Sequence, residues 1–155
     1  MITPSALLEQ TLAAYGDRLY HMALLASGDE RAAATLLLRA TRELVNAWQN
    51  QPPPQPPAEP EVLARLVTAA RDAEPRTARR GPQPGFPPFA LHHLPLDQRL
   101  ALGLHLLLGY DCARVGRALA LDEVAARASL IAAVRALGPA AGTSLPDRVE
   151  DEVCE

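Results

Sequence analysis

Lysine is absent from this sequence, and aromatic residues are scarce. The 155 residues include three Tyr, two Phe and one Trp, so aromatic residues make up only 4% of the chain. Cysteine is also rare, because Cys112 and Cys154 are too few for a disulfide framework, which favours a reducing, cytoplasmic setting. No apolar run approaches the roughly 18 residues of a membrane helix, and the N-terminus lacks a basic stretch followed by an apolar one. We therefore expect neither a membrane span nor a secretory signal.

Catalytic and nucleotide-binding motifs are missing as well. The chain has no glycine-rich phosphate loop, no His-Glu-x-x-His zinc motif and no nucleophile elbow. His92, His93 and His105 raise a zinc hypothesis together with the cysteines, but the cysteines lack ligand spacing and two of the histidines are adjacent. We therefore expect no enzymatic activity, no bound metal and no other cofactor.

Proline divides the chain into regions. Twelve of the fifteen prolines fall between Pro52 and Pro95. On both sides of them apolar residues recur three or four positions apart, and nowhere do they alternate as in a strand. The sequence therefore predicts an all-α protein with two small helical domains joined by a Pro-rich linker. The expected boundaries are 1–80 for the first domain, 81–93 for the linker, 94–138 for the second domain and 139–155 for an acidic tail.

Capping and helix-breaking residues place the individual helices. Thr3-Pro4 begins the first helix, and Gly28-Asp29 separates it from a second helix that continues to Trp48. The connector 51–60 is expected in polyproline conformation. Four more helices are then expected, over 61–73, 95–108, 112–120 and 123–137.

The stretch from Cys112 to Leu137 has the pattern of a helix-turn-helix. An aspartate precedes each of its two expected helices and can cap it. Val115, Leu119 and Leu121 are placed to fill the space between the helices, and Gly116 is small enough to let their backbones approach. The pattern is typical of DNA-binding domains, although any two capped helices can produce it.

Residues around this pattern resemble the C-terminal domain of bacterial RNA polymerase sigma factors of the extracytoplasmic-function group. Leu94-Pro95-Leu96-Asp97-Gln98-Arg99 matches that domain's Leu-Pro-x-x-Gln-Arg opening, and the match continues without a gap through Leu137. In the N-terminal half, Leu19-Tyr20 and Leu66-Val67-Thr68-Ala69-Ala70-Arg71-Asp72 are similar to segments of the family's first domain. The two domains stand in the family's order and cover most of residues 5–137.

The resemblance implies an initiation subunit that binds core RNA polymerase and promoter DNA, with an anti-sigma factor as a further partner. Arginine suits both phosphate pairing and bidentate contact with guanine. The matching DNA-binding positions carry arginines and one serine, and they are Arg71, Arg76, Arg79, Arg80, Arg114, Arg117, Arg127, Ser129 and Arg135. The matching polymerase-binding positions are Leu36, Leu37 and Arg39.

Several positions depart from the family. Where the family has acidic and Gln-Glu residues that help dock on polymerase, this chain has Thr35, Leu38 and Arg39. The loop that captures a promoter base is replaced by prolines over 52–57, and the recognition helix opens with Val124-Ala125-Ala126-Arg127 instead of Gly-Thr-Val-Lys. These losses favour an alternative, a degenerate sigma-like interaction module that binds an anti-sigma factor, another regulator or itself without recognising promoters.

Acidic residues gather at the C-terminus. From Gly138 onward, a single basic residue, Arg148, stands beside five acidic ones, which are Asp147, Glu150, Asp151, Glu152 and Glu155. Two interpretations remain open. The tail either keeps the protein in solution, or it folds onto the arginine-bearing faces and competes with DNA.

Overall fold

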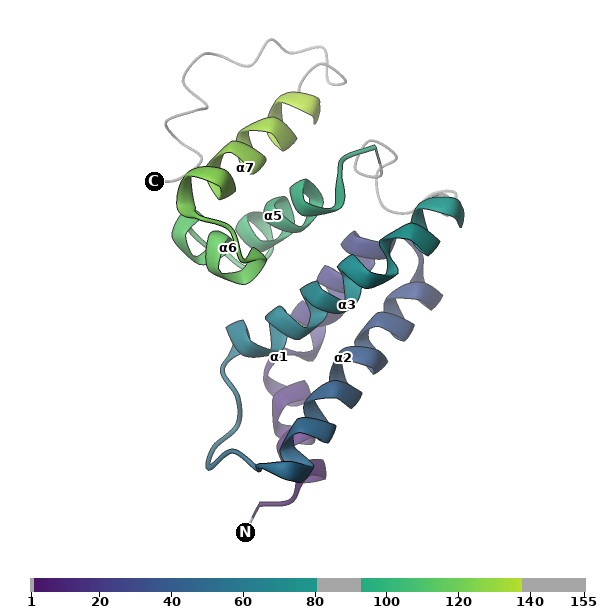
Figure 1. Cartoon of the computed structure of the whole chain (residues 1–155), viewed down its shortest axis with the longest axis vertical. Helices are drawn as coiled ribbons and strands as arrows, with labels where there is room; N and C mark the ends of the chain where they lie inside the picture. Colours follow the sequence, from purple (N-terminus) through teal and green to yellow (C-terminus); the bar gives the residue numbers. More distant parts are fainter. Residues whose placement is uncertain (1, 81–92, 138–155) are drawn as a thin grey trace. The chain divides into compact units, whose positions relative to one another are not determined.

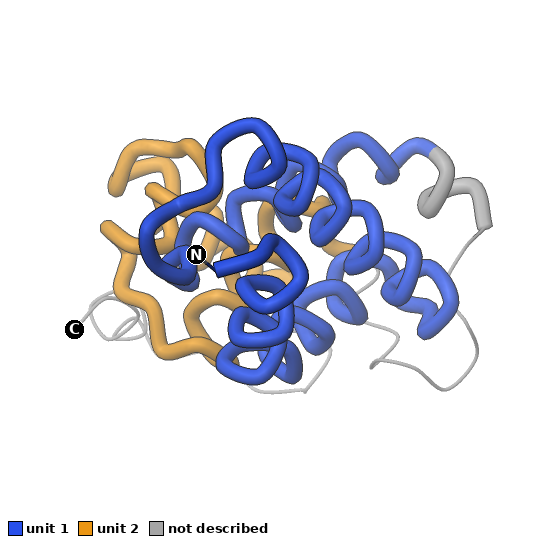
Figure 2. Tube along the Cα trace, turned by 90° about the horizontal axis from the view of Figure 1, so that it is seen from below, with its two compact units in different colours: residues 1–80 blue, residues 81–155 orange. Residues whose placement is uncertain are grey.

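The computed structural model describes residues 2–80 and 93–137, and it describes side chains over 2–75 and 93–137. All regular structure within these residues is α-helical (Figure 1), which confirms the predicted all-α class. The chain divides into two compact units, residues 1–80 and residues 81–155 (Figure 2). The expected linker over 81–93 lies outside the described residues except for His93, so it stays a prediction. Among the described helices, none combines the length and the apolar character that crossing a bilayer requires.

Unit 1 consists of three long helices, α1 (Pro4–Ser27), α2 (Glu30–Asn50) and α3 (Glu59–Arg80), and each packs on the other two. The predicted start of α1 is confirmed, because the Thr3 side chain accepts a hydrogen bond from the Ala6 amide at 3.2 Å. Gly28 ends α1 with a left-handed φ of 70°. Asp29 then caps α2 by accepting from the Arg31 amide at 3.1 Å.

Helix α3 is longer than predicted at both ends. The sequence predicts a helix over 61–73, whereas α3 spans Glu59–Arg80 and passes through Pro75. Pro60 is tolerated because the first turn of a helix leaves its amides without intrahelical partners. Pro75 costs the helix one hydrogen bond but does not end it.

The core of unit 1 draws large apolar side chains from all three helices. Trp48 of α2 is only 3% exposed, so its side chain packs in this core. At the start of α3, Glu59 is buried and forms a 2.9 Å ion pair with Arg18 of α1. The largest fully buried side chains of this unit are Leu7, Leu19, Met22, Leu44, Leu63, Leu66 and Val62.

Unit 2 consists of three shorter helices, α5 (Leu96–Leu106), α6 (Cys112–Leu119) and α7 (Glu123–Leu137), and all three pack on one another. The turn after α5 is held by two contacts across it. The Tyr110 amide donates to the Leu104 carbonyl at 3.1 Å, and the Tyr110 carbonyl lies 2.8 Å from Nδ1 of His105. Tyr110 itself is fully buried, so this turn belongs to the core of unit 2.

Candidate nucleic-acid interface

The turn between α6 and α7 brings two stretches of backbone into close contact. A Cβ on Gly116 would lie 2.7 Å from the Leu121 carbonyl oxygen and 3.2 Å from that of Asp122. The Leu121 amide donates to the Gly116 carbonyl at 2.8 Å, and Ala120 has a left-handed φ of 55°. No larger residue fits at position 116 without moving the turn. The predicted role of this glycine is therefore confirmed. The turn fixes the orientation of α7 relative to α6.

Aspartate caps begin both helices of this pair, as predicted. Oδ1 of Asp111 accepts from the Arg114 amide at 2.8 Å. Oδ1 of Asp122 accepts from the Ala125 amide at 2.6 Å. Each bond satisfies one of the amides that the first turn of a helix leaves without an intrahelical partner. Both helices of the pair therefore start at defined residues.

Helix α7 has a buried face and an outward face. Ala126, Leu130 and Ala133 are buried against the rest of unit 2. On the opposite side lie four exposed residues, which are Val124, Arg127, Ala128 and Arg135. Helical periodicity places all four within one side of the helix. The outward face therefore carries two of the arginines that the family resemblance assigns to DNA.

Ser129, the third residue assigned to DNA on α7, lies elsewhere on the helix. It is half-buried, and it is five residues from Val124. At 3.6 residues per turn this separation places it far around the helix from the outward face, beside the buried residues. The described geometry therefore separates Ser129 from Arg127 and Arg135.

Helix α6 contributes two further exposed arginines, Arg114 and Arg117. The guanidinium carbon of Arg114 lies 4.2 Å from the centre of the Tyr110 ring. A cation over an aromatic face is held in position and keeps its positive charge. Arg114 is therefore oriented by unit 2 itself and remains suitable for an anionic partner.

In unit 1, the arginines assigned to DNA are only partly described. Arg71 is half-buried on α3. Arg76, Arg79 and Arg80 belong to the same helix, but their side chains lie outside the described residues. Their assignment to DNA stays a prediction.

The polymerase-binding positions on α2 divide between the core and the surface. Leu36 is only 5% exposed, so its side chain packs in the core of unit 1, and its assignment to polymerase binding stays a prediction. Leu37 is half-buried, whereas Arg39 is exposed. The two leucines differ because successive helical residues point about 100° apart.

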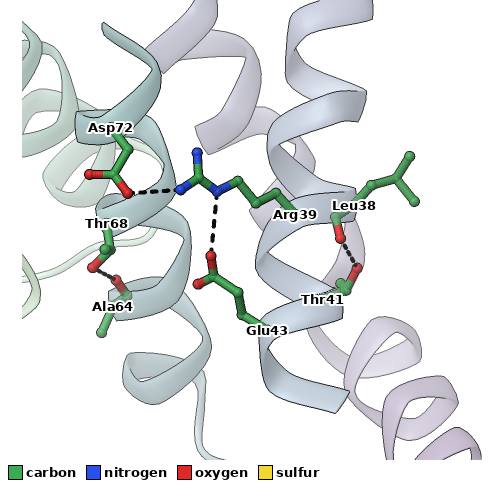
Figure 3. Close-up of polar contacts among 7 residues, drawn as sticks. All are labelled: Leu38, Arg39, Thr41, Glu43, Ala64, Thr68 and Asp72. Carbon is green, nitrogen blue, oxygen red and sulfur yellow. Dashed lines mark hydrogen bonds and ion pairs between the residues drawn. The ribbon is translucent and has the colours of Figure 1, made fainter. Parts of the chain in front are cut away.

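Arg39 bridges α2 and α3 (Figure 3). Its Nη2 lies 2.9 Å from Oδ2 of Asp72, and its Nε lies 3.4 Å from Oε1 of Glu43. Leu38 points away from this cluster and is 67% exposed. On this part of α2, the charge of Arg39 is therefore balanced by two carboxylates, and the neighbouring Leu38 is exposed.

Two exposed apolar residues, Leu38 and Val124, are absent from the site residues assigned from the sequence. Val124 is 79% exposed at the start of α7. A signal for Leu38 exists in the run Leu36-Leu37-Leu38, since three consecutive helical residues cannot all face one core. For Val124 the signal is an apolar residue directly after the capping aspartate.

Cys112 is the first residue of α6, and its side chain is only 2% exposed. It is also disulfide-bonded, contrary to the expectation drawn from the low cysteine count. The other cysteine, Cys154, lies outside the described residues, as does His92. Within residues 2–80 and 93–137, no group of three His, Cys, Asp or Glu side chains could hold a metal ion.

Comparisons of this chain with protein-family models, with curated proteins and with solved structures find no match. The similarity to sigma factors therefore depends on the residue patterns given above. The geometry of the described residues supplies the remaining arguments about function.

Proposed function

We propose that this protein is a sigma-factor-like transcription initiation protein that binds core RNA polymerase and promoter DNA. The observation that supports this proposal is the helix-turn-helix of unit 2. Its second helix, α7, is anchored on one face and presents Arg127 and Arg135 on the other. Its first helix, α6, adds Arg114 and Arg117.

In such a domain the second helix enters the major groove and the first crosses the DNA backbone. Arg127 lies in the first half of α7, the part of a recognition helix that contacts base edges, and its guanidinium can pair with both acceptors of a guanine. Arg114 and Arg117 would then contact phosphates. Unit 1 would bind polymerase through α2 near Arg39.

Reconstituted transcription tests this function directly. The full chain is mixed with core RNA polymerase and a library of promoter fragments, and specific transcripts are sequenced. We expect transcripts that share an upstream element and that disappear with Arg127→Ala. Arg65→Ala, which removes an exposed arginine from α3 of unit 1, is the matched control and should leave the same transcripts.

Arg127→Lys separates the two kinds of DNA contact. Lysine keeps the positive charge for a phosphate but loses the planar pair of donors that a guanine requires. If Arg127 contacts a base, both variants lose the promoter preference. If it contacts a phosphate, Arg127→Lys keeps that preference. A folded chain that never binds core polymerase and yields no transcripts would refute the proposal.

Two observations favour a second candidate, the sigma-like interaction module. Leu38 is 67% exposed on α2, and Val124 is 79% exposed on the outward face of α7, where a DNA-binding helix usually carries polar residues. Exposed apolar residues of this size suit a protein partner. This candidate predicts self-association or capture of a regulator that Leu38→Ser or Val124→Ser weakens, with no DNA binding at any salt concentration.

A further inference from the structure

The outward face of α7 carries apolar side chains between its arginines. Val124 is 79% exposed, and Ala128, four residues later, is exposed as well. Residues four positions apart are neighbours on a helix surface, so the two side chains form one small apolar patch. We propose that this patch contacts the 5-methyl group of a thymine in the major groove, beside the guanine that Arg127 contacts. The inference rests on the DNA-binding function proposed above and adds a base preference of the same site.

Both residues of the patch lie where a recognition helix reaches the bases. Val124 and Ala128 are the second and sixth residues of α7. In a helix-turn-helix the N-terminal residues of the second helix contact base edges. Ala126 and Leu130 are buried, and at about 100° per residue they lie roughly opposite the patch. The patch therefore points away from the core of unit 2.

The chemistry of the patch selects thymine among the four bases. In the major groove thymine presents a methyl group, whereas the edges of guanine, adenine and cytosine present hydrogen-bond donors and acceptors. Val124 and Ala128 have no polar side-chain atom, so they cannot replace the hydrogen bonds that water makes with such an edge. Against a methyl group they lose no hydrogen bond and remove apolar surface from water. The patch therefore favours a thymine over any other base.

The surroundings of the patch favour DNA over a protein as its partner. A stable protein interface buries about 800 Å² on each side, and two side chains of this size supply only a small part of that area. Arg127 and Arg135 lie on the same face of α7, and positive charge beside an apolar patch matches a groove lined by phosphates. The acidic Glu123 points about 100° away from Val124 around the helix axis.

The spacing on α7 predicts how far apart the two bases lie. Val124 and Arg127 are three positions apart, so their Cβ atoms are separated by about 5–6 Å. Successive base pairs are stacked about 3.4 Å apart. The thymine should therefore lie within about two base pairs of the guanine that Arg127 contacts.

Selection of DNA duplexes identifies the element. The full chain, alone and together with core RNA polymerase, is used to select from a library of random duplexes at low salt, and the retained duplexes are sequenced. We expect a shared element that contains a thymine close to a guanine and that Arg127→Ala no longer selects. A shared element with no thymine close to that guanine would overturn the inference.

Replacement of the selected thymine by uracil isolates the methyl group. Uracil pairs with adenine as thymine does and lacks only the 5-methyl group. The unmodified chain should bind the uracil duplex about fourfold more weakly, the effect expected for burial of one such group. Val124→Ser should bind the two duplexes with nearly equal affinity. Because Val124 is 79% exposed, this substitution should leave unit 2 folded. Equal binding of the two duplexes by the unmodified chain would contradict the methyl contact.

Two further variants separate a contact with the methyl group from a general loss of affinity. Val124→Ile keeps an apolar side chain and should keep the preference for thymine over uracil. Leu106→Ser, the matched control, replaces a leucine that is 68% exposed at the end of α5, outside the helix-turn-helix, and it should also keep the preference. If Val124→Ser weakens binding to both duplexes to the same extent, Val124 does not contact the methyl group and the inference fails.

Failure of the inference is distinguishable from failure of the proposed function. A selected element that depends on Arg127 but not on the methyl group overturns the inference and leaves the proposed function intact. A folded chain that selects no duplex, alone or with core polymerase, refutes the proposed function and the inference together. Self-association of that chain, weakened by Val124→Ser, would then assign Val124 to the interaction module.

Discussion

Units 1 and 2 secure their helices in different ways. The helices of unit 1 have 24, 21 and 22 residues, and those of unit 2 have 11, 8 and 15. A long helix spreads its apolar contacts over many turns, so no single residue decides where it lies. The short helices of unit 2 depend more on the residues of their turns, above all on Gly116. The surface of α7 is therefore positioned by a few backbone contacts.

The two units also hold arginine differently. In unit 1, Arg39 lies between Asp72 and Glu43, which neutralise it. In unit 2, Arg114 lies over the ring of Tyr110, which carries no net charge. An arginine held by carboxylates gives up most of its attraction for an anion, whereas one held by an aromatic ring keeps it. This difference is the physical reason why Arg114 suits an anionic partner better than Arg39 does.

The largest expected effect comes from Trp48→Ala, which tests whether the two units are independent. Removal of this buried side chain should lower the free energy of unfolding of unit 1 by about 3–5 kcal/mol. Hydrogen exchange measured by mass spectrometry should then show loss of protection in residues 4–50 and 59–80 and none in residues 96–137.

Leu119→Ala is the counterpart in unit 2, since this side chain is fully buried there. It should leave unit 1 protected. If either variant removes protection from both units equally, the division of the chain into two units fails.

Gly116→Ala should have the next largest effect and tests the turn. The added Cβ would overlap the Leu121 carbonyl, which is backbone and cannot rotate away. We expect the free energy of unfolding of unit 2 to fall by about 2 kcal/mol, as measured by urea denaturation of the full chain.

Gly16→Ala in α1 is the matched control. Its Cβ would meet nothing closer than 3.9 Å, so the gain in helix propensity should stabilise unit 1 by about 0.5–1 kcal/mol. If Gly116→Ala lowers the free energy of unfolding and Gly16→Ala raises it, then of these two positions only Gly116 has no room for a Cβ. Equal signs would contradict it.

Asp122→Ala should cost about 1 kcal/mol by removing the cap of α7. Asp122→Asn keeps the oxygen that accepts from the Ala125 amide, so it should cost only a few tenths of a kcal/mol. Thermal unfolding followed by circular dichroism measures both. A loss for the Asn variant as large as that for Ala would mean that the negative charge, rather than the hydrogen bond, holds the start of α7.

The smallest effect is expected for the Arg39–Asp72 ion pair in unit 1. A double-mutant cycle with Arg39→Ala and Asp72→Ala should give a coupling of about 0.2–1 kcal/mol, because both side chains are about half exposed. The coupling should fall towards zero in roughly 1 M salt. A coupling that persists in salt would show that Arg39 is held more firmly than a surface pair.

Much of the fold could be predicted because helix boundaries are local. Thr3-Pro4, Gly28-Asp29, Asp111 and Asp122 each act on the backbone within four residues, and the structure confirms all of them. The end of α3 could not be predicted in this way. Pro75 disfavours a helix but does not forbid one, so neighbouring contacts decide whether the helix continues.

The candidate surfaces were less predictable, because a sequence leaves the rotation of each helix open. The run Leu36-Leu37-Leu38 fits several rotations of α2, and only packing on α1 and α3 buries the first leucine and exposes the last. Arg39 meets Asp72 across 33 positions of sequence, and no local pattern pairs them.

The amino-acid sequence by itself determined the helical class of this protein, its caps and its helix-turn-helix, since these depend on residues within a turn or two of one another. Only the tertiary structure decided which side chains contact one another and which stay exposed, because that depends on how separate helices rotate and pack.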